Sequence, residues 1–107
     1  MPTMDLGIGL LERGEFATAR EIFLRLQQSQ PKDARVWYLS ALAEGLTKGE
    51  WKGQPQRLAE KGLECERQGN PSTAQIDAAL ATHTPIKGQD WIASLRRRIL
   101  DVSDRGK

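Results

Sequence analysis

The sequence contains few of the residue types that build catalytic or metal sites. Its 107 residues include one cysteine, Cys65, and one histidine, His83. A single cysteine cannot form a disulfide within the chain or a cysteine-rich metal site, so the expected setting is the reducing cytoplasm. We expect Cys65 to be a small core residue and His83 to be a surface or capping residue, so no cofactor or metal site is predicted.

Aromatic residues and long apolar runs are also scarce. Phe, Trp and Tyr make up 6% of the chain, which argues against a β-sandwich. No run of about 18 apolar residues occurs, so no membrane-spanning helix is expected. Residues 1–14 lack a basic leader ahead of an apolar segment, so no secretory signal is expected either. With 38% hydrophobic and 28% charged residues, the composition is typical of one folded domain.

An excess of charge of one sign is missing as well. The net charge is +2, too small to imply nucleic-acid binding, although the basic residues gather near the C-terminus at Arg96, Arg97 and Arg98. Three consecutive helical residues point in different directions, so they do not form one face. We expect them to be solvated. The alternative is a weak basic patch that contacts phosphate or an acidic partner.

Apolar residues recur at helical spacing along most of the chain. Between Phe16 and Ser29, for example, Ala19, Ile22 and Phe23 begin a stripe that faces a core. Glycine or proline ends each such segment, and Ser72 begins a predicted capping box. The predicted helices cover residues 5–13, 16–29, 33–47, 55–68, 73–82 and 89–102. No period-2 alternation predicts a strand, so the fold class is all-α.

Three predictions concern which residues are buried and which face solvent. The helix over 33–47 is apolar around most of its circumference, which predicts that it is buried between neighbours. Trp51 and Trp91 are predicted to be core or staple residues, and an exposed tryptophan at either place would mark a binding hot spot. The glutamates of the helix over 55–68 are predicted to lie on a solvated face: Glu60, Glu64 and Glu66.

Residues 3–36 match a known helical repeat of about 34 residues. The matching positions are Leu6, Gly7, Leu10, Gly14, Glu15, Phe16, Ala19, Phe23, Leu26 and Pro31. In this pattern the segment resembles a tetratricopeptide repeat. The resemblance implies a hairpin of two antiparallel helices, in which small residues at Gly7 and Ala19 allow close approach.

A second, divergent unit over residues 37–70 resembles the same repeat less closely. Trp37 stands at the first aromatic position and Ala41 at the small position, and residues 49–51 repeat the turn one residue late. Residues 53–55 interrupt the pattern, and residues 71–107 do not match it. We therefore expect a single domain, residues 1–107, with three stacked hairpins. The third hairpin, within residues 71–107, is divergent and caps the array, because two units are fewer than such arrays need.

The resemblance also implies a concave groove that binds extended or helical peptides. By position, its residues here are Met4, Ile8, Leu11, Glu12, Tyr38, Leu42 and Leu46. The lysine and asparagine that grip a carboxylate in some members are replaced by Met4, Ile8 and Leu42. Such an apolar groove either holds an apolar peptide or partner helix, or is filled by the chain's own C-terminal helix. We favour self-filling, because it needs no partner and completes the array.

The predicted function is protein–protein interaction, as a scaffold or adaptor that is not an enzyme. The expected partner is a protein or peptide, bound in the apolar groove or on the outer face, and the chain itself is a monomer or homodimer. Two alternatives stay open. One is a self-associating structural domain. The other is weak binding of nucleic acid or an acidic partner through Arg96, Arg97 and Arg98.

Overall fold

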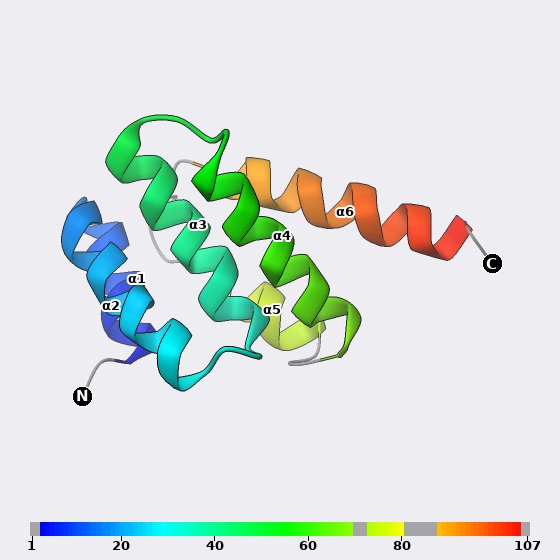
Figure 1. The fold of residues 1–107 in the computed structure, drawn as a ribbon, viewed down its shortest axis with the longest axis horizontal. Coiled ribbons are helices and arrows are strands. Elements are labelled where there is room, and N and C mark those ends of the chain that lie inside the picture. Colours follow the sequence, from blue (N-terminus) through cyan, green and yellow to red (C-terminus); the bar gives the residue numbers. More distant parts are fainter. Residues whose placement is uncertain (1–2, 70–72, 81–87, 106–107) are drawn as a thin grey trace.

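The computed structural model describes residues 3–69, 73–80 and 88–105 (Figure 1). Within these ranges the chain forms α-helices and no strand, so the predicted all-α class is confirmed. The helices are α1 (Met4–Glu12), α2 (Phe16–Ser29), α3 (Ala34–Lys48), α4 (Gln54–Arg67), α5 (Thr73–Leu80) and α6 (Gln89–Arg105). The predicted capping residue Ser72, the end of the fifth predicted helix at Thr82, and His83 lie outside the described residues.

Local chemistry explains where the helices begin and end. The Thr3 hydroxyl accepts a hydrogen bond from the Leu6 amide, 3.2 Å away, at the start of α1. Asp33 caps α3 as predicted, because its Oδ1 accepts from the Arg35 amide at 3.0 Å. Gly49 ends α3 with a φ of 76°, a left-handed conformation that glycine adopts without steric cost. The predicted boundaries are therefore close to the observed ones, and those of α2 agree fully.

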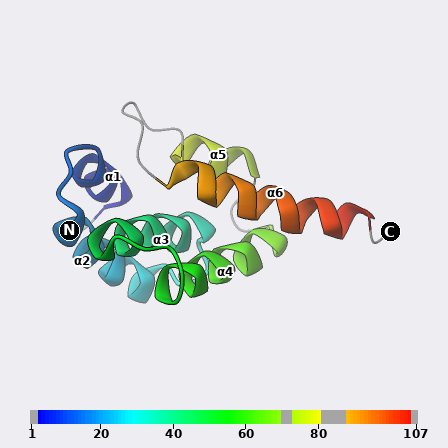
Figure 2. The same cartoon turned by 90° about the horizontal axis from the view of Figure 1, so that it is seen from above.

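The helices pack mainly as neighbours along the chain. α1 and α2 form one hairpin, α3 and α4 form a second, and α2 lies against α3, so that α3 is central (Figure 1). α5 and the first half of α6 lie across one face of the α3–α4 pair, on the same side as α1 (Figure 2). The second half of α6 extends past the other helices in both views.

The central position of α3 explains its apolar character. Its side chains are covered by α2 and α4 at the flanks and by α5 and α6 above. Ten consecutive or near-consecutive residues of α3 are buried: Ala34, Val36, Tyr38, Leu39, Ser40, Ala41, Leu42, Ala43, Glu44 and Gly45. The prediction that this helix is buried between neighbours is confirmed.

Glycines placed beneath aromatic rings set the spacing of both hairpins. A Cβ atom at Gly7 would lie 2.5 Å from Cζ of Phe23, whose side chain is fully buried. A Cβ atom at Gly62 would lie 2.8 Å from Cδ1 of Tyr38, which is equally buried. Any larger residue would separate the helices, so each glycine lets an aromatic ring pack directly on the backbone.

Two tryptophans connect the start of α6 to the loop before α4. The rings of Trp51 and Trp91 have centroids 4.9 Å apart and are tilted by 36°. Both rings are half-buried and pack against the core, as predicted. Gly45 and Gly88 lie against the Trp51 ring, where a Cβ atom would come within 2.2 and 2.3 Å. This cluster fixes one end of α6.

Two glycines of α1 provide a matched test of the close approach. Gly7→Ala is expected to destabilise the domain by about 1–3 kcal/mol, because the new methyl group meets the immobile Phe23 ring. Gly9→Ala, where no atom lies within 4 Å of the added Cβ, is expected to be neutral or to stabilise by about 0.5–1 kcal/mol through helix propensity. Urea denaturation measures both. Equal effects of the two substitutions would contradict the packing argument.

Candidate functional site

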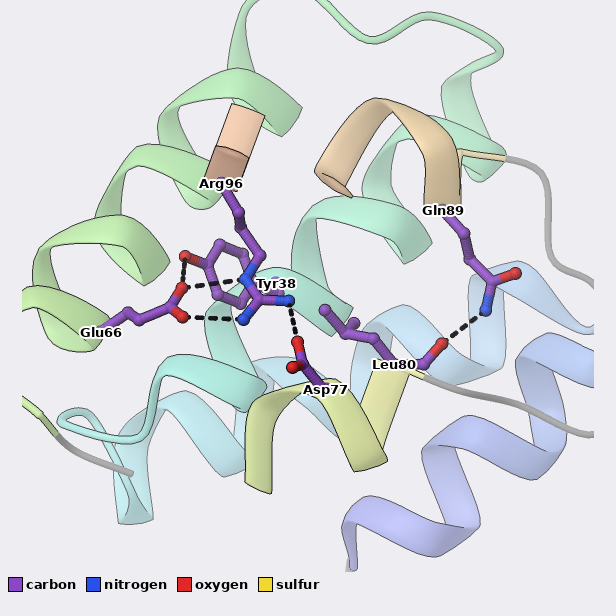
Figure 3. Close-up of polar contacts among 6 residues, drawn as sticks. All are labelled: Tyr38, Glu66, Asp77, Leu80, Gln89 and Arg96. Atoms are coloured by element: carbon purple, nitrogen blue, oxygen red, sulfur yellow. Dashed lines mark hydrogen bonds and ion pairs between the residues drawn. The ribbon is translucent and has the colours of Figure 1, made fainter. Parts of the chain in front are cut away.

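A cluster of polar side chains joins α6 to the three helices that it covers, α3, α4 and α5 (Figure 3). It consists of Tyr38 from α3, Glu66 from α4, Asp77 from α5 and Arg96 from α6. Figure 3 shows the Arg96 guanidinium between the two carboxylates and beside the Tyr38 ring. We refer to these four residues as the arginine cluster.

The geometry of the arginine cluster is that of a bidentate ion pair with added support. Arg96 donates from Nε to Glu66 Oε1 at 2.9 Å and from Nη2 to Oε2 at 2.7 Å. Its Nη1 donates to Asp77 Oδ1 at 2.8 Å, and its Cζ lies 5.6 Å from the Tyr38 ring centroid. Tyr38 donates its hydroxyl proton to Glu66 Oε1 at 2.7 Å. The guanidinium is therefore held in its plane and covered on one face.

Burial divides the cluster into a dry inner part and a wet outer part. The side chains of Glu66 and Arg96 are 1% and 11% exposed, whereas that of Asp77 is 62% exposed. A buried ion pair is sensitive to the loss of either partner, because the remaining charge is left without water or a counter-charge. The Glu66–Arg96 pair therefore carries the electrostatics of the cluster, and Asp77 contributes at its rim.

The pKa values follow from this arrangement. Burial alone would raise the pKa of Glu66, but the hydrogen bonds from Arg96 and Tyr38 outweigh it and hold that pKa below its usual value. Burial and the neighbouring Glu66 raise the pKa of Tyr38, so its hydroxyl stays protonated. The carboxylates that surround Arg96 raise the pKa of its guanidinium despite burial. The cluster is thus a fixed pair of charges with a neutral phenol at physiological pH.

Helical spacing places these side chains together. Gly62 lies four residues before Glu66, so both lie on the face of α4 that meets α3. Because Gly62 lets the Tyr38 ring approach, the phenol oxygen reaches the Glu66 carboxylate. On α6, Ile92 lies four residues before Arg96, and both are buried.

Comparisons with known protein families, with curated proteins and with solved structures find no match to this chain.

The predicted groove residues fall into two groups. Tyr38, Leu42 and Leu11 are 0%, 1% and 2% exposed, and α5 and α6 lie against the helix that carries the first two. The others are half-buried: Met4, Ile8, Glu12 and Leu46. In this conformation the α3 side is therefore covered by the chain itself, and the partly accessible positions are on α1 and at the end of α3.

The expectation of solvated charges was wrong at two positions. Taken as whole residues, backbone included, Arg96 is 9% exposed and Glu66 is 6% exposed, because their side chains pair with each other between α6 and α4. Arg97 is exposed, and the side chain of Arg98 lies outside the described part of the chain. Within the described residues the arginine run therefore offers one exposed guanidinium and not a patch. A signal was present, since Arg96 falls within the apolar stripe of its helix, four residues after Ile92.

The other glutamates of α4 behave as predicted. Glu60 and Glu64 are exposed. They line a shallow open depression of about 590 Å³ along α4, with Arg57, Lys61, Leu63 and Arg67. Charges of both signs alternate there, so the depression is not an apolar groove.

A second buried carboxylate joins α2 to α3. The side chain of Glu44 is 4% exposed and pairs with Arg20 from α2, while Lys48 Nζ lies 3.1 Å from its Oε1. Burial alone would raise the pKa of Glu44, but Arg20 and Lys48 together hold it below its usual value. The α3–α4 pair is thus joined to its neighbours by buried carboxylates on both sides. Glu44 pairs with Arg20 of α2, and Glu66 pairs with Arg96 of α6.

Cys65 has the structural role predicted for it. It is 6% exposed, and its thiol lies 3.8 Å from the Pro31 carbonyl oxygen, to which it donates. Burial raises the pKa of this thiol, which keeps it protonated and poorly nucleophilic.

The described residues form neither a metal-ligand cluster nor a membrane-spanning helix. In the ranges that the structure covers, no three His, Cys, Asp or Glu side chains are placed to share a metal ion. Among the helices of those ranges, none is both long enough and apolar enough to cross a lipid bilayer.

Adjacent arginines provide a matched test of the buried ion pair. Arg96→Gln is expected to lower the free energy of unfolding by about 3 kcal/mol, because Glu66 loses its counter-charge while it is buried. Arg97→Gln makes the same chemical change at an exposed position and is expected to stay within about 0.5 kcal/mol of the parent. Urea denaturation at pH 7 measures both, and similar losses in the two variants would refute the assignment.

Stability is expected to fall in acid as the cluster is neutralised. Because the folded-state pKa of Glu66 lies below its unfolded value of about 4.3, its contribution is complete above that value. The contribution is lost as the pH falls through the lower, folded-state pKa. Glu66→Gln should therefore be less stable than the parent at pH 7 and converge with it in acid. Glu60→Gln, at an exposed position of the same helix, should follow the parent curve. A constant gap for Glu66→Gln between pH 7 and pH 3 would contradict this.

Proposed function

We propose that this chain is a non-catalytic protein-interaction module, built as a short tetratricopeptide-like array with a divergent C-terminal cap. Three features support the architecture. The α1–α2 hairpin has Gly7 packed on Phe23, as the repeat pattern requires. The α3–α4 hairpin follows it with Gly62 beneath Tyr38. α5 and α6 then cover one face of the α3–α4 pair, so that the second hairpin is not left open on that side.

The binding proposal depends on one face of α1, which carries Met4, Ile8 and Glu12. Met4, Ile8 and Glu12 follow one another at four-residue intervals and are all half-buried, so they form one stripe on the helix. These are the α1 positions that the repeat resemblance assigns to the groove. An apolar peptide or helix would contact this stripe, with Glu12 at its polar edge.

The titratable groups with shifted pKa values are placed for a structural role and not for a catalytic one. The buried acids each pair with arginine, and Tyr38 and Cys65 donate to a carboxylate and a carbonyl oxygen. Active sites usually hold such groups next to a cleft where a substrate can reach them. Here they lie between helices, which favours a structural role for their charges.

Nucleic-acid binding through the arginine run loses support. The Arg96 guanidinium is already occupied by Glu66 and Asp77, so it cannot contact a phosphate in this conformation. Among the described side chains of the run, Arg97 alone is exposed, and one guanidinium is too little charge for the strong phosphate binding that such proteins show.

Peptide selection tests the α1 face directly. Peptides selected from a displayed random library against the full chain are expected to lose about tenfold or more in affinity on Ile8→Gln, because a polar group enters the contact. Leu24→Gln, at a 41% exposed apolar position of α2, is the control and should leave affinity within about twofold. Circular dichroism confirms that both variants fold. Failure to enrich any peptide, or equal losses in both variants, would refute the proposal.

A further inference from the structure

α6 is attached to the domain by a short stripe in its first half. The stripe begins where Trp91 meets Trp51, continues through buried Ile92, and ends at Arg96. Beyond this point the helix axis runs past α4 and α5 in both views (Figures 1 and 2). Leu95, between Ile92 and Arg96, also packs against the core, and the Gln89 side chain donates to the Leu80 carbonyl oxygen at 2.7 Å (Figure 3). The described anchors of α6 therefore all lie within its first two turns, from Gln89 to Arg96.

The partner groups of Arg96 form a complete site for a guanidinium. Glu66 accepts two parallel hydrogen bonds, and Asp77 accepts a third. The Tyr38 ring provides the aromatic face (Figure 3). This arrangement requires a cation that is both planar and able to donate several hydrogen bonds in one plane. An ammonium group is not planar and would fit it poorly. The groups that accept from Arg96, and the ring beside it, all belong to α3, α4 and α5 and none to α6.

The site can be emptied without leaving a buried, unpaired charge. Glu66 keeps the hydrogen bond from the Tyr38 hydroxyl, because neither residue belongs to α6. When α6 moves away, it uncovers the carboxylate, and water replaces the guanidinium. An ion pair that must be desolvated contributes less net affinity than an apolar contact of similar size, so this attachment favours specificity over strength.

We propose that α6 is an exchangeable internal ligand, and that the Tyr38–Glu66–Asp77 site also accepts an amphipathic helix of a partner protein. This inference rests on the proposed interaction function and names a second site for it. The partner helix would carry an aromatic residue, an aliphatic residue next to it, and an arginine four residues after the aliphatic, as in Trp91, Ile92 and Arg96. While α6 occupies the site, the module is closed to that partner.

A partner helix is a better occupant than α6 of a second copy. A second copy offers the same side chains, so exchange between copies gains no contact. The chain's own α6 has an effective concentration in the millimolar range, which a second copy at micromolar concentration cannot match. A partner helix with additional contacts can compete, because its affinity is not limited to the contacts that α6 makes between Gln89 and Arg96.

The first experiment uses a fluorescent peptide of residues 89–105 and measures its binding by anisotropy. Arg96→Glu in the full chain places a third carboxylate beside Glu66 and Asp77 and should release α6. The peptide is expected to bind this variant about tenfold or more tightly than the parent chain, because the internal competitor is gone. Arg97→Glu in the full chain is the matched control and should bind the peptide as the parent does.

Changes in the peptide test the chemistry of recognition. A peptide with Arg96→Gln should bind the released chain at least tenfold more weakly, whereas one with Arg97→Gln should bind like the unmodified peptide. Equal binding of the two peptides would overturn the inference. So would equally weak binding to the parent and to an Arg96→Glu chain whose circular dichroism shows that it is folded. A concentration-dependent dimer of the parent, formed by exchange of α6, would overturn the choice of a partner helix.

Hydrogen exchange on the parent chain keeps the inference testable if Arg96→Glu does not fold. Amides of α6 should exchange at least tenfold faster than those of α3, because α6 detaches without global unfolding. Equal protection of α3 and α6 would overturn the inference. A chain that binds selected peptides through Ile8 but never the peptide of residues 89–105 keeps the proposed function and loses only this second site.

Discussion

The Glu66 carboxylate determines how the C-terminal half of this domain is assembled. It accepts the phenol of Tyr38 from α3 and the guanidinium of Arg96 from α6, and Arg96 in turn reaches Asp77 on α5. While α6 covers it, this side chain is 1% exposed, and the hydrogen bonds from these partners keep it ionised. The position of α6 over the α3–α4 pair is therefore specified by one charge, and the apolar contacts of Ile92 and Trp91 add to it.

That carboxylate depends on a glycine one turn earlier in the same helix. Because Gly62 has no side chain, the ring of Tyr38 packs on the backbone of α4, and its hydroxyl comes within 2.7 Å of Glu66. The first hairpin uses the same device, with Gly7 beneath Phe23, but there the ring carries no hydroxyl and the contact is purely apolar. One packing solution thus gives a dry interface in the first hairpin and a polar one in the second.

The helices could be predicted from the sequence because their signals are local. Apolar spacing, the Asp33 cap and the glycine at the end of α3 each act within a few residues of the chain. The pairing of Glu66 with Arg96 could not be predicted, because the two residues are 30 positions apart in the sequence. A charged residue considered on its own helix is expected to face solvent, and only the fold shows where its counter-charge lies. The burial of Tyr38 and Leu42 was expected from the apolar circumference of α3, but spacing within α3 does not determine which helices cover them.

The choice of arginine at position 96 follows from the shape of its site. A lysine would bring one point charge to two carboxylates and could not donate in parallel to both oxygens of Glu66 while lying flat on the Tyr38 ring. A hydrocarbon side chain would bury the same area but would leave the carboxylate without a counter-charge. Only a planar cation with several donors can bind Glu66 and Asp77 and also pack on the Tyr38 ring. A site with that requirement selects the helix that covers it by a single residue, which an ordinary apolar contact does not do.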